Sequence, residues 1–177
     1  MPERIVVIGL TGPRLLPEAL AQARLTLGSE RHFAILELCP NFHGCLPSGD
    51  GVPGDRVPGD GVPGDGSRSD SVPARAVLGS GGLSLAQGLD RIAAEPDTVA
   101  VLASGDPGFF GIVRPLADRF GSDRLDIHPA PSSVSLAFAM LGLAWDDALV
   151  VSAHGRPLDQ AVAAACGGSK VAVLTSP

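Results

Sequence analysis

The sequence predicts an α/β fold with a mostly parallel sheet. Short β-type runs alternate with segments of helical periodicity, and several runs are continuously apolar rather than alternating. Continuous apolar runs are typical of strands covered on both faces, and helices placed between strands favour parallel pairing. The expected strands are 4–9, 33–38, 98–103, 125–128, 148–152 and 170–174.

Apolar side chains at helical spacing predict four helices between these strands. A fifth, Ala-rich helix is expected over 157–166, because Gly167 and Gly168 follow it and glycine commonly ends helices. The four stripes are Leu16, Leu20, Ala23 and Leu27; Leu85, Leu89 and Ile92; Phe109, Ile112, Val113, Leu116 and Phe120; and Val134, Ala137, Phe138 and Leu141.

Composition narrows the class of protein. The 177 residues are 45% hydrophobic, which suits one ordinary domain or two small lobes. A net charge of −6 disfavours a general nucleic-acid or anionic-membrane surface, and no apolar run reaches the roughly 18 residues of a membrane helix. Three cysteines form no disulfide framework, so we expect a cytoplasmic protein.

Residues 47–73 differ from the rest of the chain. Val-Pro-Gly-Asp occurs at 52–55, 57–60 and 62–65, and Pro and Gly dominate the whole segment. Such a composition buries too little apolar surface to offset its ordering entropy. We expect a flexible, surface-exposed insertion within the first part of the fold.

The loops that follow the strands are the first places to look for function, because parallel α/β sheets bind ligands beyond their carboxyl ends. The first loop, 9–13, lacks the G-x-G-x-x-G pattern, and Thr11 stands where a second glycine would approach a pyrophosphate. A dinucleotide site is therefore disfavoured, and both an ordinary turn and another ligand contact stay open.

Two further loops have polar residues at the start of an expected helix. Asp106 either caps the helix that begins at Pro107 or accepts a hydrogen bond from a ligand hydroxyl or ammonium. Ser132 and Ser133 either cap the next helix or mark an N-terminus that attracts a carboxylate.

The fourth loop, 152–157, carries His154 and Arg156. His154 is a candidate acid or base near neutral pH, and Arg156 is a candidate partner for a carboxylate, although a structural role for the histidine stays open. Cys39, His43 and Cys45 lack a fourth ligand, so no metal site is expected.

Taken together, the loop sequences resemble the tetrapyrrole (corrin/porphyrin) methylases. The matching blocks are ASGDPGFFGI at 103–112, PAPSSVSLAFAMLGLAWDDA at 129–148 and SAHGR at 152–156. VVIGL at 6–10 and GSERHFAIL at 28–36 are weaker matches. Within that family the blocks most resemble members that methylate C5 of a precorrin in cobalamin biosynthesis.

The resemblance implies a two-lobed fold with S-adenosylmethionine in the cleft between an N-terminal lobe, 1–122, and a C-terminal lobe, 123–177. Methyl transfer then depends on positioning the donor and the reacting carbon, with His154 as the candidate base. The residues implied in cofactor binding are Leu10, Gly105, Asp106, Phe109, Ser132 and Ser133.

A precorrin substrate carries several carboxylates, and Arg14, Arg114 and Arg156 are the candidate residues that bind it. The resemblance also implies a separate partner protein that methylates C15 and decarboxylates, and a homodimer is expected because half a second lobe would expose apolar surface. Family members continue beyond Pro177, so the second lobe is expected to be truncated. Thr11 and Phe110 also depart from the family pattern, which has a glycine and a tyrosine there.

Two other functions remain open. One is a truncated relative without catalytic activity that binds ligand weakly or not at all. The other is a nucleotide-dependent α/β oxidoreductase, against which the missing G-x-G-x-x-G pattern counts.

Overall fold

The computed structural model describes residues 1–40, 74–79, 81–153 and 158–175. Their strands form a five-stranded sheet of order β3-β2-β4-β1-β5 and a two-stranded sheet, β6-β7, in which every pair is parallel. The predicted α/β class is confirmed. The strands are β1 Ile5–Leu10, β2 Leu25–Gly28, β3 Ala74–Val77, β4 Val99–Ser104, β5 Leu125–His128, β6 Leu149–Ser152 and β7 Val171–Leu174.

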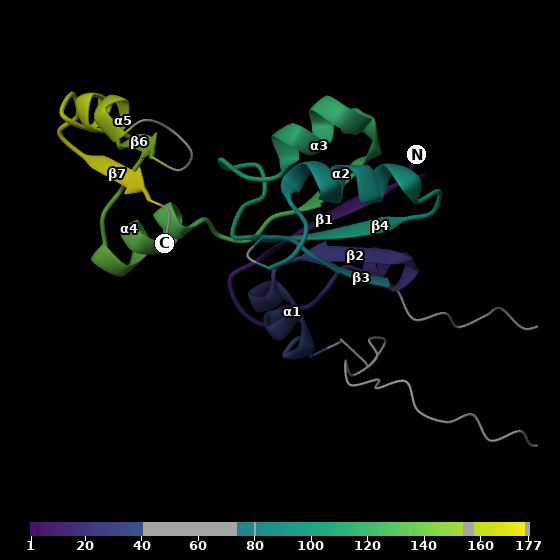
Figure 1. Cartoon of the computed structure of the whole chain (residues 1–177). Helices are drawn as coiled ribbons and strands as arrows, with labels where there is room; N and C mark the ends of the chain where they lie inside the picture. Colours follow the sequence, from purple (N-terminus) through teal and green to yellow (C-terminus); the bar gives the residue numbers. More distant parts are fainter. Residues whose placement is uncertain (41–73, 80, 154–157, 176–177) are drawn as a thin grey trace, which may run out of the picture.

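Helices cover both faces of the five-stranded sheet, with α2 and α3 on one face and α1 on the other (Figure 1). The apolar runs of β1 and β4 are buried, and their alternate side chains enter two core clusters. This is why both strands read as continuous apolar runs. The helices are α1 Glu30–Glu37, α2 Leu85–Ala94, α3 Val113–Phe120, α4 Ser133–Leu141 and α5 Leu158–Ala165, with 3-10 turns η1 Glu18–Gln22 and η2 Ser122–Arg124.

The strand expected over 33–38 is wrong, because this segment belongs to α1. Phe33 and Leu36 are 0% and 1% exposed and lie one helical turn apart, whereas Glu37 and Leu38 are exposed. A helix places the first pair on the core face together, which a strand with its period of two does not. The apolar residues of this segment therefore alternate between core and solvent with the period of a helix.

The helix expected along Leu16 to Leu27 is also wrong. Only η1 is helical there, and the segment ends in β2, which lies between β3 and β4 with all four residues buried. Gly28 fits this strand because a Cβ there would lie 3.0 Å from the Cβ of Leu102. The partner strand β3 was not predicted, because its sequence ARAV is short and contains an arginine.

The helix expected from Phe109 begins at Val113 instead. Phe110 has a φ of +55°, outside the helical region, and a Cβ on Gly111 would lie 2.4 Å from the carbonyl oxygen of Pro107. A tight turn therefore separates the end of β4 from α3. The Ala-rich segment does form a helix, α5.

The first sheet extends further along the chain than the boundary expected at residues 122 and 123. β5 pairs with β1 in register from Ile5 with Leu125 to Ile8 with His128, so the strand belongs to the first sheet. The second unit consists of α4, β6, α5 and β7 and lies beside the loops of the first sheet (Figure 1). None of the helices among the described residues has the length and hydropathy of a membrane-spanning segment.

Candidate functional site

The loops after β4, β1 and β5 meet at one edge, because these strands are neighbours and run in the same direction. The Gly105 N–H donates to the Leu10 carbonyl at 2.9 Å, and the Ala130 N–H donates to the Gly105 carbonyl at 3.2 Å. These two hydrogen bonds tie three chain segments together through backbone groups alone. The loops in which the sequence predicts a site are therefore hydrogen-bonded to one another through their backbones.

Two glycines permit this close approach. A Cβ on Gly9 would lie 2.0 Å from the carbonyl oxygen of Gly105, which is far inside van der Waals contact. Gly105 has a φ of +59°, and a Cβ there would lie 3.3 Å from the Cα of Ser132. The turn that contains Asp106 and the turn that contains Ser132 are thus packed against each other, as the loop pattern predicts.

Asp106 shapes its own turn. Its Oδ1 accepts the Gly108 N–H at 2.8 Å, and its backbone carbonyl accepts the Phe109 N–H at 3.1 Å. No described group donates to its second carboxylate oxygen. The helix expected to begin at Pro107 does not form, so Asp106 caps no helix and instead stabilises the turn after β4. Its half-buried carboxylate keeps one oxygen that no described group uses.

Ser132 is the N-cap of α4. Its Oγ accepts the Ser135 N–H at 3.0 Å, and the Ser135 hydroxyl donates to the Ser132 carbonyl at 2.8 Å. Ser132 is 9% exposed, whereas Ser133 is exposed. The Ser132 hydroxyl is therefore occupied by the helix start, and Ser133 offers the open hydroxyl of the pair.

Leu10 was expected to contact the cofactor, and that role stays a prediction. Its side chain is 2% exposed and packs in the core cluster beneath α1, and its carbonyl accepts the Gly105 N–H. The side chain therefore contributes to the core of the sheet. Phe109 packs edge-on against Phe110 with ring centroids 5.0 Å apart, and Phe110 is 52% exposed.

Arg14 connects the ends of β1 and β5. Its Nη1 donates to the Gly9 carbonyl at 3.1 Å and to the Pro129 carbonyl at 2.8 Å. Beside it lies a hollow of about 280 Å³, lined by Thr11–Arg14 and Pro129–Pro131. Arg114 is exposed at the start of α3 and does not line this hollow.

His154 and Arg156 lie outside the described residues, as do His43, Cys45 and the 47–73 segment. Among the described residues, no three His, Cys, Asp or Glu side chains come together as a metal site would require. A larger hollow of about 490 Å³ lies between the end of β3 and the start of α2, and its lining includes none of the expected site residues.

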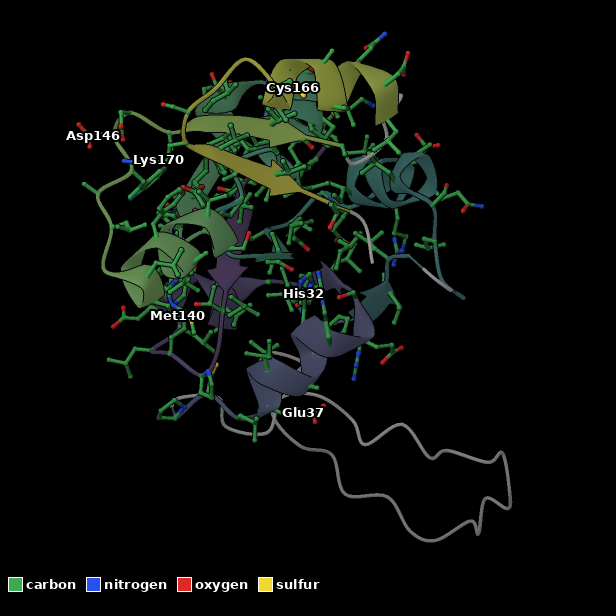
Figure 2. The ribbon with its side chains drawn as sticks, turned by 90° about the vertical axis from the view of Figure 1, so that its left-hand side faces the viewer. His32, Glu37, Met140, Asp146, Cys166 and Lys170 are labelled. Atoms are coloured by element: carbon green, nitrogen blue, oxygen red, sulfur yellow. The ribbon has the colours of Figure 1, made fainter. Side chains whose placement is uncertain are left out.

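Sequence reasoning missed a polar cluster at the same edge, formed by Arg31, His32 and Ser104. Arg31 Nη2 donates to Ser104 Oγ at 2.6 Å, and His32 Nε2 lies 2.9 Å from the same oxygen. Figure 2 shows His32 at the top of α1, on the side facing the rest of the molecule. The Arg-His pair at the start of a helix was the available signal, and the expected strand over 33–38 concealed it.

The environment of His32 keeps its imidazole neutral. Burial, and to a smaller extent the neighbouring Arg31 charge, together lower the pKa of His32 to about 4. His32 is therefore uncharged at neutral pH and acts at this edge as a hydrogen-bonding group rather than a cation.

The parallel α/β fold, with loops that meet at one edge of the sheet, defines a class of ligand-binding proteins. Comparison with known proteins identifies the family. The sequence model of the Tetrapyrrole (Corrin/Porphyrin) Methylases matches residues 63–177. This range covers more than half of the chain, including the turns that contain Asp106 and Ser132. The chain belongs to this family, in agreement with the resemblance seen in the sequence.

Two individual proteins show which members of the family are similar to this chain. The chain is 48% identical over 88 residues to precorrin-6Y C(5,15)-methyltransferase [decarboxylating] from Sinorhizobium sp, an alignment covering 50% of this chain and 21% of that protein. It is 42% identical over 69 residues to cobalt-precorrin-7 C(5)-methyltransferase from Salmonella typhimurium, covering 38% and 34%. These matches span about a fifth to a third of the relatives' lengths.

A solved structure supports the fold. The crystal structure of the cobalamin biosynthesis precorrin-6Y methylase from Archaeoglobus fulgidus aligns with a TM-score of 0.51 at 24% identity. The alignment covers 85% of this chain and 63% of that one. The arrangement of helices and strands is therefore shared with a member of the family.

Proposed function

We propose that this protein is an S-adenosylmethionine-dependent C-methyltransferase that methylates C5 of a precorrin in cobalamin biosynthesis. The observation that carries the proposal is the junction of the loops after β1, β4 and β5, joined by backbone hydrogen bonds through Gly105. It lies at the sheet edge where parallel α/β folds bind ligands. Family membership and the names of the two curated relatives support the reaction type and the substrate class.

The side chains at this edge fit the chemistry of the cofactor. S-adenosylmethionine has an ammonium group and ribose hydroxyls that donate hydrogen bonds, and Asp106 has a carboxylate oxygen that no described group occupies. We assign Gly105, Asp106, Phe109, Ser132 and Ser133 to cofactor binding and keep Leu10 as a further candidate. When bound, the cofactor supplies an activated methyl group on a sulfonium.

The residues of this chain act by positioning. Gly105 keeps the two turns in contact without a side chain between them, and Asp106 accepts hydrogen bonds from the cofactor's donors. The exposed ring of Phe110 is available to exclude water beside the reacting carbon. Holding two reactants in a near-attack geometry contributes up to about 7–11 kcal/mol in favourable cases. We keep His154 as the proposed base.

We propose that arginine side chains bind the carboxylates of the substrate. Arg14 lines the hollow between the β1 and β5 loops, and we retain it, Arg114 and Arg156 as candidates for the precorrin carboxylates. A cytoplasmic location, a homodimer and a separate protein for C15 methylation and decarboxylation complete the proposal. The exposed apolar residues of α4, among them Met140 and Leu141, support a homodimer because water contact with such a surface is unfavourable.

Calorimetric titration with S-adenosylhomocysteine tests the cofactor assignment. Asp106→Asn keeps an acceptor for the Gly108 N–H but removes the charge, and we expect affinity to fall at least about tenfold because a charged hydrogen bond is lost. Asp118→Asn, an exposed carboxylate on α3, is the matched control and should bind as the wild type does.

The substrate assignment needs a separate measurement. Wild-type protein incubated with S-adenosylmethionine and a precorrin should yield a product heavier by one methyl substitution, and mass spectrometry of the fragments should locate it at C5. Binding of S-adenosylhomocysteine without methyl transfer would favour the non-catalytic relative. Equal affinity of Asp106→Asn and wild type would show that the cofactor assignment is wrong.

A further inference from the structure

The start of α1 and the end of β4 bring together three side chains that the proposed cofactor contacts do not use. Ser104 is the last residue of β4 and directly precedes Gly105 and Asp106. Its hydroxyl oxygen lies 2.6 Å from Arg31 Nη2 and 2.9 Å from His32 Nε2. The cluster therefore belongs to the same edge as the candidate site and adjoins it through the backbone.

The direction of these hydrogen bonds follows from the histidine tautomer. His32 Nδ1 accepts the backbone N–H of Ser29 at 3.2 Å. A neutral imidazole has one acceptor and one donor nitrogen, so the proton is on Nε2. The pKa of His32, lowered to about 4, keeps the ring neutral at neutral pH. His32 therefore donates to Ser104.

The Ser104 hydroxyl can form only one further hydrogen bond, as a donor. A hydroxyl has two acceptor lone pairs and one donor hydrogen, and Arg31 and His32 fill the two lone pairs. No described group accepts the hydrogen of this hydroxyl, and Ser104 is exposed. The cluster thus presents an O–H donor to whatever occupies the edge of the sheet.

Arg31 adds a positive charge beside this donor. It is exposed and forms no ion pair with a carboxylate among the described residues. Arg75 provides the contrast, because its guanidinium lies 3.3 Å from Glu30 and 3.7 Å from Glu37. Only one donor of the Arg31 fork is used by Ser104, so further N–H groups remain for an anion.

We propose that Arg31 and Ser104 form a carboxylate-binding subsite, in which His32 is a positioning residue that holds the Ser104 hydroxyl as a donor. The inference rests on the proposed function, because both of its ligands carry carboxylates. One source is the amino-acid part of the cofactor, and the other is the periphery of the tetrapyrrole. The cluster offers donors and positive charge and no acceptor, which is the complement of a carboxylate.

The first experiment compares a macrocycle that carries carboxylates with its neutral ester. Fluorescence titration of the full chain with uroporphyrin I and with its octamethyl ester should show preference for the acid. If the subsite holds a carboxylate of the macrocycle, Arg31→Gln should reduce that preference at least about tenfold, because a charge-assisted contact is lost. Arg91→Gln is the matched control, since Arg91 is exposed in the last turn of α2, at the opposite edge of the sheet.

A second arm identifies which carboxylate is bound. S-adenosylhomocysteine and its decarboxylated analogue are titrated into the wild type and into Arg31→Gln. If the subsite holds the cofactor's carboxylate, Arg31→Gln weakens the first ligand and leaves the second unchanged. If it holds the macrocycle's carboxylate, only the uroporphyrin affinity changes.

Variants of Ser104 test the donor. Ser104→Ala should weaken the same carboxylate ligand several-fold, and Ser104→Thr, which keeps the hydroxyl, should restore it. Thermal unfolding of each variant establishes that the loss is not a failure to fold. A merely structural serine would change the unfolding temperature and leave the ratio of acid to ester affinity as in the wild type.

The outcomes separate the two proposals. If Arg31→Gln binds both carboxylate ligands as tightly as the wild type, or if the wild type shows no carboxylate preference with either pair of ligands, the subsite is overturned. If the acid preference depends on Arg31 but S-adenosylhomocysteine does not bind at all, the subsite stands and the proposed methyltransferase function fails.

Discussion

The central strands of the five-stranded sheet and the strands of the two-stranded sheet have similar apolar sequences but very different burial. All six residues of β1 are buried, whereas Leu149 of β6 and Val173 of β7 are 40% and 48% exposed. The first sheet has helices on both faces, and the described part of the second has α5 packed against β6 and β7. An apolar run therefore predicts a strand, and the layers around it determine how far it is buried.

A few apolar residues of the second unit are also buried. Val134, Phe138, Val151 and Ala161 are buried, and the Phe138 and Trp145 rings are stacked with centroids 6.2 Å apart. Yet Met140 is 88% exposed, and α4 is apolar around most of its circumference. In Figure 2, Met140 lies on α4 toward the outside of this unit. The two units should accordingly respond differently to the same kinds of substitution.

The largest expected effect is on the first core. Leu27→Ala, at a residue 0% exposed in β2, should lower the free energy of unfolding by about 2–5 kcal/mol because it opens a cavity. Val173→Ala, at a half-exposed residue of β7, should cost less than about 1 kcal/mol. Urea unfolding measures both, and similar losses for the two variants would contradict the difference in burial.

An intermediate effect depends on pH. The pKa of His32 is lowered from 6.5 to about 4 in the folded protein, so the unfolded chain binds more protons between these values. The contribution of neutral His32 to the free energy of unfolding should be fully present above pH 6.5 and should be lost as the pH decreases towards 4. After allowance for solvent screening, we expect this loss to be roughly 1–2 kcal/mol.

Thermal unfolding of the wild type and His32→Gln across this pH range isolates that contribution. The variant should lose less stability between pH 6.5 and 4, because its side chain does not titrate. Parallel curves for the two proteins would show that His32 is not the group responsible. Among its described residues, the second unit has no histidine that would add a similar slope.

The smallest expected effect is on the exposed face of α4. Met140→Lys should change the free energy of unfolding by less than about 0.5 kcal/mol, because an exposed side chain loses little on substitution. Measurement at two protein concentrations sharpens the comparison. A large loss that grows as the protein is diluted would show that a second copy covers this surface.

Much of the candidate site could be predicted because it depends on local chemistry. Ser132 was predicted to cap a helix and does so, whereas Asp106, also predicted as a cap, stabilises a turn instead because the helix begins only at Val113. That the two turns lie together agrees with the resemblance, which implies that both contact one cofactor. The cluster of Arg31, His32 and Ser104 could not be predicted, because it joins residues about 70 positions apart.

The errors have a common physical origin. The apolar segments around Leu25 and Phe33 are too short for periodicity to separate strand from helix, so their neighbours in space decide the outcome. Leu25 lies in a strand because β2 forms backbone hydrogen bonds with β3 on one side and β4 on the other. Phe33 lies in a helix because α1 buries its apolar side chains against one face of the sheet.

By itself, the sequence determined the α/β class, the parallel pairing and the turns that carry Asp106 and Ser132, because these follow from hydrophobic patterns and local hydrogen bonding. The tertiary structure alone decided the strand order, the assignment of β5 to the first sheet and the meeting of Arg31 with Ser104. Those features depend on which distant segments pack together, and the free energy of that packing is a property of the assembled layers rather than of any single segment.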